Sequence, residues 1–120
     1  MTYYLTLENL LDLIAASEIG PVRDLGLLAS GAHRPQTSLF GQDAYPSIDH
    51  KAAALLESLV RNHALVDGNK PLGWIAAMVF FGLNGITIEA PEDLAYDLVI
   101  AVATGQRSIE EIAAQLAQWH

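Results

Sequence analysis

The chain has 120 residues, a formal net charge of −8 and no cysteine, and 52% of its residues are hydrophobic. Its length predicts one domain, residues 1–120, with a hydrophobic core of its own. The lack of cysteine excludes disulfides, thiolate metal sites and a cysteine nucleophile, and it suits a reducing cytoplasm. The six basic residues are scattered along the chain, so we expect no broad surface for direct binding of nucleic acid.

The hydropathy pattern argues against a membrane protein. No basic segment followed by an apolar stretch stands at the N-terminus, so we expect no signal peptide. The longest apolar run, Trp74 to Phe81, is far too short to cross a bilayer. We therefore expect a cytoplasmic protein without a membrane partner. The surplus of hydrophobic residues suggests a surface that meets another protein.

Two helices are predicted in the first third of the chain. Thr6 is placed to cap the first helix, which carries leucines and an isoleucine at helical spacing and ends near Gly20. Asp24 is placed to cap the second helix. Pro35 disfavours helical geometry in the residue before it, so this helix ends before that proline.

The middle of the chain combines an irregular segment with a third helix. Residues 35–47 contain two prolines and a glycine, and Thr37 to Phe40 within them reads as a short extended piece. The third helix is predicted from Ser47 or Asp49 to Asn62, because apolar residues recur there on one face.

Three more helices are predicted in the second half. The fourth runs from Pro71 to Asn84 and is apolar nearly all round, which predicts a buried central helix. Pro91 stands where the fifth helix begins, and that helix ends at Thr104. Ser108 opens a capping box for a sixth helix that runs to the C-terminus. Six helices and no confident sheet predict an all-α domain.

The segment His63 to Lys70 carries a concentrated set of polar residues between the third and fourth helices. Histidine can accept a hydroxyl proton near neutral pH, and Asp67 is a hard oxygen ligand of the kind that Mg²⁺ takes. Gly68 and Asn69 precede a helix N-terminus, where backbone N–H groups and the helix dipole favour anions. A base, a metal ligand and a phosphate-binding segment thus fall within eight residues.

Simpler interpretations of these residues remain open. A lone histidine between helices is usually structural, Asp67-Gly68-Asn69 is an ordinary turn sequence, and a lysine such as Lys70 is usually solvated. The segment does not match a phosphate loop, a zinc-binding HExxH helix or an EF-hand. The order of the residues, and the apolar helix that follows them, favour a functional site.

The string HALVDGNK, from His63 to Lys70, resembles the signature HxFx(D/E)(G/A)N(G/K)R of the Fic/Doc family. The lysine after the asparagine is similar to the Doc branch, because most Fic proteins have glycine there. The similarity is good from about Ala53 to the C-terminus. It implies a compact six-helix Fic/Doc fold with a central buried helix after the catalytic loop.

The resemblance also implies a function. Doc-type proteins are toxins of toxin–antitoxin pairs that use ATP and Mg²⁺ to phosphorylate a threonine of elongation factor Tu, which halts translation. Most Fic relatives instead transfer AMP to a target hydroxyl, and Lys70 favours the phosphoryl alternative. The implied partners are a Phd-type antitoxin and the target protein.

Roles for individual residues follow from the same resemblance. His63 would be the base for the target hydroxyl, and Asp67 would hold magnesium. The irregular segment Thr37 to Phe40 would be the flap that positions the target peptide. The phosphates would be held by Gly68, Asn69, Lys70 and Arg61.

Two positions depart from the signature. Leu65 replaces a phenylalanine that anchors the loop in the core, and leucine can do this at modest cost. Pro71 stands where the signature has an arginine that binds nucleotide phosphates. Three accounts of Pro71 stay open: a natural variant with different or lost activity, a change selected or introduced because active toxin is hard to produce, or a slow enzyme that relies on Lys70 and Arg61.

Two further functions therefore stand beside the transferase. A Fic/Doc fold that has lost catalysis could persist as the binding partner of an antitoxin, and Pro71 supports this alternative. The chain could also be an unrelated helical interaction domain in which the loop match is accidental.

Overall fold

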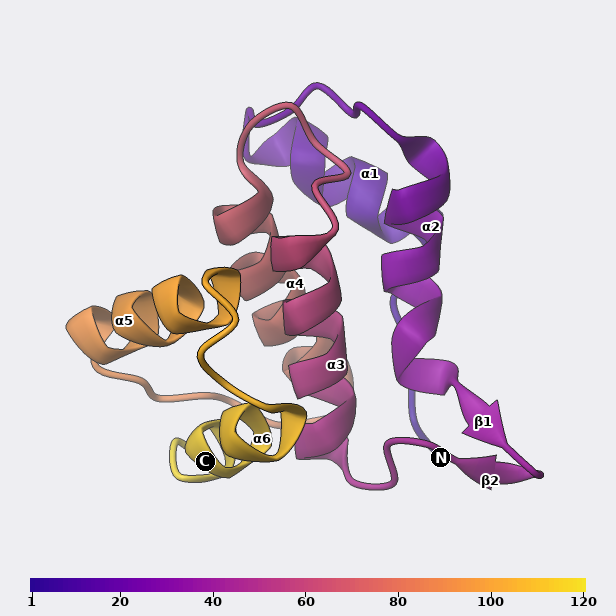
Figure 1. Cartoon of the computed structure of the whole chain (residues 1–120), viewed down its shortest axis with the longest axis vertical. Helices are drawn as coiled ribbons and strands as arrows, with labels where there is room; N and C mark the ends of the chain where they lie inside the picture. Colours follow the sequence, from indigo (N-terminus) through magenta and orange to yellow (C-terminus); the bar gives the residue numbers. More distant parts are fainter.

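The computed structural model describes all residues 1–120 and is dominated by helices (Figure 1). The helices are α1 (Leu7–Ala16), α2 (Leu25–His33), α3 (Ile48–Arg61), α4 (Asn69–Leu83), α5 (Glu92–Ala103) and α6 (Ile109–Ala117). A short 3₁₀ helix, η1 (Arg34–Gln36), follows α2, and the strands β1 (Ser38–Leu39) and β2 (Gln42–Asp43) form one small hairpin. The six-helix, all-α fold class is confirmed.

Local capping explains where several helices begin. The side chains of Thr6, Asp24, Ser47 and Ser108 each accept a hydrogen bond from the backbone N–H three residues on, as their positions predict. The helix α4 begins at Asn69, two residues before the predicted start, because Gly68 caps it with left-handed backbone rather than with a side chain.

The helix α3 lies at the centre of the molecule and packs against α2, α4, α5 and α6 (Figure 1). The helix α4 buries one side against it at close range, because Gly73 faces Val60. A Cβ at position 73 would lie 2.5 Å from the Cγ2 of Val60, so only glycine permits this approach. The helix α4 is therefore buried against the core as expected. The helix α3 lies beside it at the centre of the molecule.

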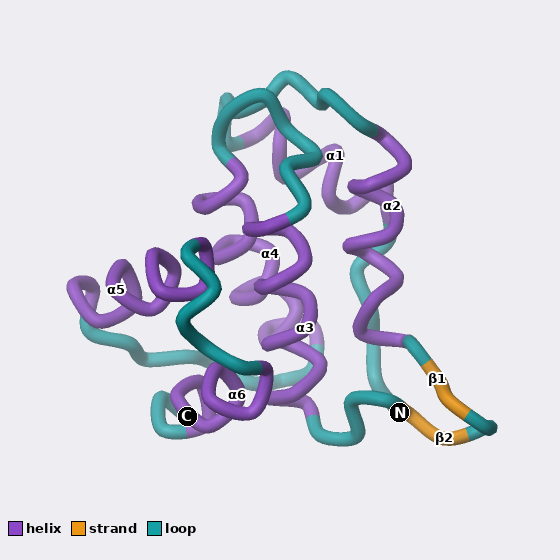
Figure 2. Tube along the Cα trace, in the orientation of Figure 1, coloured by secondary structure: helices purple, strands orange, loops and turns teal.

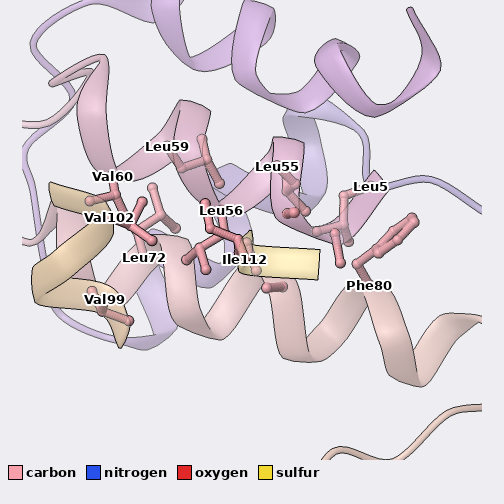
Figure 3. Close-up of a cluster of buried hydrophobic side chains, with 14 of the residues drawn as sticks. Leu5, Leu55, Leu56, Leu59, Val60, Leu72, Phe80, Val99, Val102 and Ile112 are labelled. Carbon is pink, nitrogen blue, oxygen red and sulfur yellow. The ribbon is translucent and has the colours of Figure 1, made fainter. Parts of the chain in front are cut away.

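The core is formed where these helices meet. Figure 3 shows side chains of α3, α4, α5 and α6 converging on one another, together with Leu5 from the N-terminal segment. Leu56 of α3, Phe80 of α4 and Ile112 of α6 are completely buried. No helix of the structure has the length and apolar character that crossing a membrane requires.

The hairpin β1–β2 corrects one expectation. It stands beside the N-terminal end of α3, whereas the loop 62–68 follows the C-terminal end, about 20 Å away along a 14-residue helix (Figure 1). Thr37 to Phe40 therefore do not lie over the loop 62–68, where the resemblance leads us to expect the flap. The sequence correctly predicts the extended piece, but tertiary packing places it at the N-terminal end of α3, opposite the loop.

Two cations fasten this hairpin to α3. The buried Lys51 donates to Asp43 at 3.0 Å and to the carbonyl of Tyr45 at 2.7 Å. Arg34 donates to Glu57 at 2.8 Å and to the hydroxyl of Tyr45 at 3.2 Å. Burial alone would lower the pKa of Arg34, but these hydrogen bonds outweigh burial and hold that pKa above its ordinary value. Both cations are thus engaged by α3 and by residues of the hairpin and its flank.

Candidate active site

The loop 62–68 turns the chain from α3 into α4 (Figure 2). Leu65 anchors this loop in the core. Leu65 is 1% exposed and belongs to the main hydrophobic core. Its backbone forms an isolated antiparallel bridge with Val22, from the segment between α1 and α2. Leucine therefore fills the anchoring position that the family signature gives to phenylalanine.

Two asparagines fix the shape of the loop. The carboxamide of Asn62 donates to the carbonyl of Leu27 at 2.8 Å and accepts from the N–H of Ala64 at 3.2 Å. The carboxamide of Asn69 accepts from the N–H of Leu65 and donates to the carbonyl of the same residue, both at 3.0 Å. The side chain of Asn69 is thus committed to the loop, and only its backbone N–H is open to a ligand.

The segment Ile19 to Asp24 runs beside the loop, although about 40 residues separate the two in sequence (Figure 2). Backbone hydrogen bonds of 2.7–3.0 Å link the segment to Ala64, Val66 and Asp67. Gly68 is needed at the far end of this pairing, because its φ is +95° and a Cβ there would lie 2.6 Å from the Cβ of Ile19. Its own N–H is taken by the carboxylate of Asp67.

His63 is presented to solvent on this framework. It is exposed, and its imidazole has no hydrogen-bond partner within the chain. Its φ is +55°, an uncommon conformation for a residue with a Cβ. Its carbonyl accepts two N–H groups from the guanidinium of Arg23, one at 2.9 Å from Nε and one from Nη2.

Asp67 is the acidic residue of the loop. It is exposed, and its Oδ1 accepts the Gly68 N–H at 2.9 Å, which leaves its other oxygen open. No cluster of three or more histidine and acidic residues that could enclose a metal ion exists in the chain. One free carboxylate fits Mg²⁺ that is held chiefly by nucleotide phosphates and water, as is usual for this ion.

The N-terminus of α4 offers two free donors. The backbone N–H groups of Asn69 and Lys70 have no acceptor within the chain, and the ammonium group of Lys70 forms no ion pair. Pro71 is the third residue of the helix and has no N–H, so it fits the first turn but supplies no donor. The N-terminal end of α4 thus has two free backbone donors, where most residues at position 71 would provide a third.

A groove of about 500 Å³ opens between α4 and α5 next to this helix end. We call it the α4–α5 groove. Six of its nine lining residues are hydrophobic, and Lys70 and Pro71 belong to its wall. The lining is completed by Trp74, Ala90, Glu92, Ala95, Tyr96, Val99 and Ile100.

Arg61 is the last residue of α3. It is exposed at the end of α3, and its guanidinium packs against Gly105 at the end of α5, where a Cβ would lie 2.7 Å from its Nη1. No acidic partner holds it. The structure therefore brings His63, Asp67 and Lys70 onto one loop and helix end, and places Arg61 beside the neighbouring helix.

Sequence reasoning missed Arg23 and the segment that carries it. The only sequence feature next to Arg23 is Asp24, which caps α2. Nothing in the residue spacing links Arg23 to a loop 40 residues later. The contact of Arg23 with a backbone carbonyl leaves no pattern of residue types that a sequence could reveal.

Comparisons with known proteins agree with the fold and the loop. The sequence model of the Fic/DOC family matches residues 4–81, which include the loop and most of α4. "Toxin Doc" of Mycolicibacterium smegmatis (strain ATCC 700084 / mc(2)155) is 49% identical over 124 residues, an alignment that covers 98% of this chain and 93% of that protein.

Proposed function

The chain belongs to the Fic/DOC family, and on that premise we propose that it is the toxin of a toxin–antitoxin pair. Members of the family are generally nucleotide-transferring enzymes. In this proposal the toxin transfers a phosphoryl group from ATP to a hydroxyl of a target protein, elongation factor Tu by resemblance. One observation carries the proposal: an exposed, unpartnered imidazole stands on a loop that ends in two unpartnered helix N–H groups.

The proposed chemistry assigns His63 the role of base. Its free imidazole takes the proton of the target hydroxyl, and the oxygen then attacks the γ-phosphorus of ATP. The bond from the γ-phosphorus to the bridging oxygen breaks, and ADP leaves with that oxygen. His63 is available for this role because no group of the chain occupies its ring nitrogens.

The phosphates are proposed to lie at the N-terminus of α4. The N–H groups of Asn69 and Lys70, the ammonium group of Lys70 and the helix dipole all favour negative charge there. Asp67 would hold the Mg²⁺ that accompanies ATP and neutralises charge on its phosphates. The α4–α5 groove continues from Lys70 and is mostly apolar, which suits the rest of a nucleotide.

Because Pro71 has no charged donor for the phosphates, we expect the proposed transfer to be slow. A lost charge-assisted hydrogen bond is worth about 1.5–3 kcal/mol, or roughly one to two decades in rate or affinity. Because position 71 lines the α4–α5 groove next to Lys70, an arginine there would stand at the proposed phosphate site. Pro71→Arg should therefore raise transfer by roughly 10- to 100-fold.

A second candidate function is favoured by the same residue. A Fic/DOC fold without the arginine could act only as the binding partner of an antitoxin, which by resemblance is of the Phd type. An antitoxin partner accords with the name of the 49% identical relative. Under this alternative the unchanged fold would bind its partner and transfer nothing.

The deciding experiment measures which labelled phosphate of ATP is transferred to the target protein. The chain and its His63→Ala and Pro71→Arg variants are incubated with elongation factor Tu, Mg²⁺ and ATP labelled on either the α or the γ phosphate. His33→Ala is the matched control, because His33 is also exposed but lies at the end of α2. Transfer of γ label alone, lost in His63→Ala and kept in His33→Ala, supports the proposal.

Other outcomes separate the alternatives. Transfer of α label would identify an AMP transferase. Transfer by Pro71→Arg alone would identify this chain as a disabled copy of the enzyme. Equal nucleotide affinity and equal transfer in the chain and in Pro71→Arg would contradict the role given to position 71.

A further inference from the structure

The guanidinium of Arg23 makes an unusual contact for a surface cation. In a chain of net charge −8, Arg23 has no carboxylate within ion-pair distance. It instead directs Nε and Nη2 at one atom, the carbonyl oxygen of His63, with an Nε–O distance of 2.9 Å. Arg23 pairs with none of the fourteen acidic residues and instead binds a single carbonyl. This choice of partner indicates that Arg23 stabilises the conformation of the His63 peptide.

The backbone at His63 needs such support. His63 is the second residue beyond α3, where a left-handed residue commonly ends a helix and is usually glycine. The backbone hydrogen bond that ordinarily closes such a helix end is missing, because the N–H of His63 has no acceptor in the chain. Two side chains replace it: Asn62 binds the N–H of Ala64, and Arg23 binds the carbonyl of His63.

Docking of the neighbouring segment does not require this side chain. The backbone N–H groups of Arg23 and Asp24 already bind the carbonyl of Ala64 at 2.7 and 3.0 Å. The N–H of Val66 binds the carbonyl of Pro21 at 2.9 Å. These bonds use main-chain atoms only, so the contribution of the guanidinium itself is its contact with the carbonyl of His63.

We propose that Arg23 is a positioning residue that locks the His63 backbone in its left-handed conformation and thereby sets the direction of the imidazole. The catalytic part of this inference rests on the proposed function, in which His63 is the base. With the carbonyl fixed, the Cα–Cβ bond of His63 keeps one direction out of the loop before any substrate arrives, which limits the places that the rotamers of the ring can reach. Without the guanidinium the residue relaxes toward ordinary backbone angles, and the ring leaves its working position.

The test compares three variants. Arg23→Met removes every donor, Arg23→Lys keeps the charge but offers no fork, and Arg107→Met makes the same charge change on the connection between α5 and α6. Nuclear magnetic resonance of the labelled chain reports the His63 backbone, through its HN–Hα coupling and Cα shift, and the ring direction, through contacts of the imidazole with loop protons. Steady-state transfer is measured with and without Pro71→Arg.

The expected result is specific to His63. In Arg23→Met the His63 coupling, Cα shift and ring contacts change, while amide signals outside residues 18–25 and 62–69 stay in place. Its kcat falls about 10- to 100-fold with KM for ATP unchanged, Arg23→Lys lies between, and Arg107→Met matches the parent chain. A fall in kcat alone distinguishes positioning from a general loss of structure, which would also weaken ATP binding.

Two results would overturn the inference. Unchanged His63 signals in Arg23→Met would show that the guanidinium does not hold the backbone, and changed signals with an unchanged kcat would show that the hold does not matter to the reaction. If no form of the chain transfers label, the proposed kinase function fails on its own, and the resonance measurements still decide whether Arg23 positions the imidazole.

Discussion

The carboxamide of Asn69 closes the loop on itself. Its oxygen and nitrogen bind the N–H and the carbonyl of Leu65, so one planar group satisfies both polar atoms of a buried residue. Leu65 lies in the core, where unpaired peptide groups are costly. The same residue therefore shapes the loop through its side chain and offers a donor to a ligand through its backbone.

This dual use gives a prediction for Asn69→Ala. Loss of two hydrogen bonds at a buried peptide should lower the free energy of unfolding by about 1–3 kcal/mol, as measured by urea denaturation. Gln42→Ala, on the exposed strand β2, is a control that should change stability little. An Asn69→Ala midpoint equal to that of the control would mean that the loop keeps its shape without the carboxamide.

At the scale of elements, the hairpin β1–β2 depends on a buried cation. Lys51 is 2% exposed and sits under the hairpin, where it binds the carboxylate of Asp43 and the carbonyl of Tyr45. Its ammonium also lies 5.8 Å from the ring centre of Tyr4, within range of a cation–π attraction. Two strands of two residues would not be stable alone, so this anchor accounts for their order.

Replacement of Lys51 by Met tests the anchor. The apolar length is kept and the donors are lost, which leaves the Tyr45 carbonyl without its partner, so the free energy of unfolding should fall by about 1–3 kcal/mol. Asp43→Asn removes the carboxylate charge but keeps an oxygen acceptor at the exposed end of the pair, so it should cost less than Lys51→Met. Thermal denaturation of both proteins decides, and equal losses would contradict a dominant role for the buried contact with Tyr45.

The elements differ in how far the sequence could predict them. Caps such as Thr6 and Ser108 act within three residues, so their helices begin where the sequence indicates. For the hairpin the sequence predicts only an extended piece, because two-residue strands carry no alternation of apolar and polar residues. Its place at the far end of α3 depends on Lys51 and Arg34, which are tertiary contacts that local patterns do not encode.

The candidate site shows the same division. His63, Asp67 and Lys70 could be identified because a short motif places them on one loop. Neither the commitment of the Asn69 side chain to Leu65 nor the approach of Arg23 could be predicted, because both depend on how distant backbone segments pair. The motif thus names the residues, and the fold decides which of their atoms are free.

For the molecule as a whole, the last two residues tie the C-terminal half to the core. Trp119 meets Trp74 of α4 edge to face, with 6.3 Å between ring centres, and its carbonyl accepts the N–H of Glu89 at 2.8 Å. His120 pairs with Asp49 near the start of α3 at 2.6 Å. These contacts join α6, α3, α4 and the segment that leads into α5.

Of these two residues, Trp119 should matter more for stability. It is 9% exposed and supports Trp74, which lines the α4–α5 groove, so Trp119→Ala leaves a cavity beneath the groove and should lower the free energy of unfolding by about 3–5 kcal/mol. His120→Ala removes one pair near the surface and should cost about 1 kcal/mol or less. Urea denaturation of the two variants measures this ratio. Equal losses would mean that α6 is held by the contact of His120 with Asp49 and not by the packing of the two tryptophans.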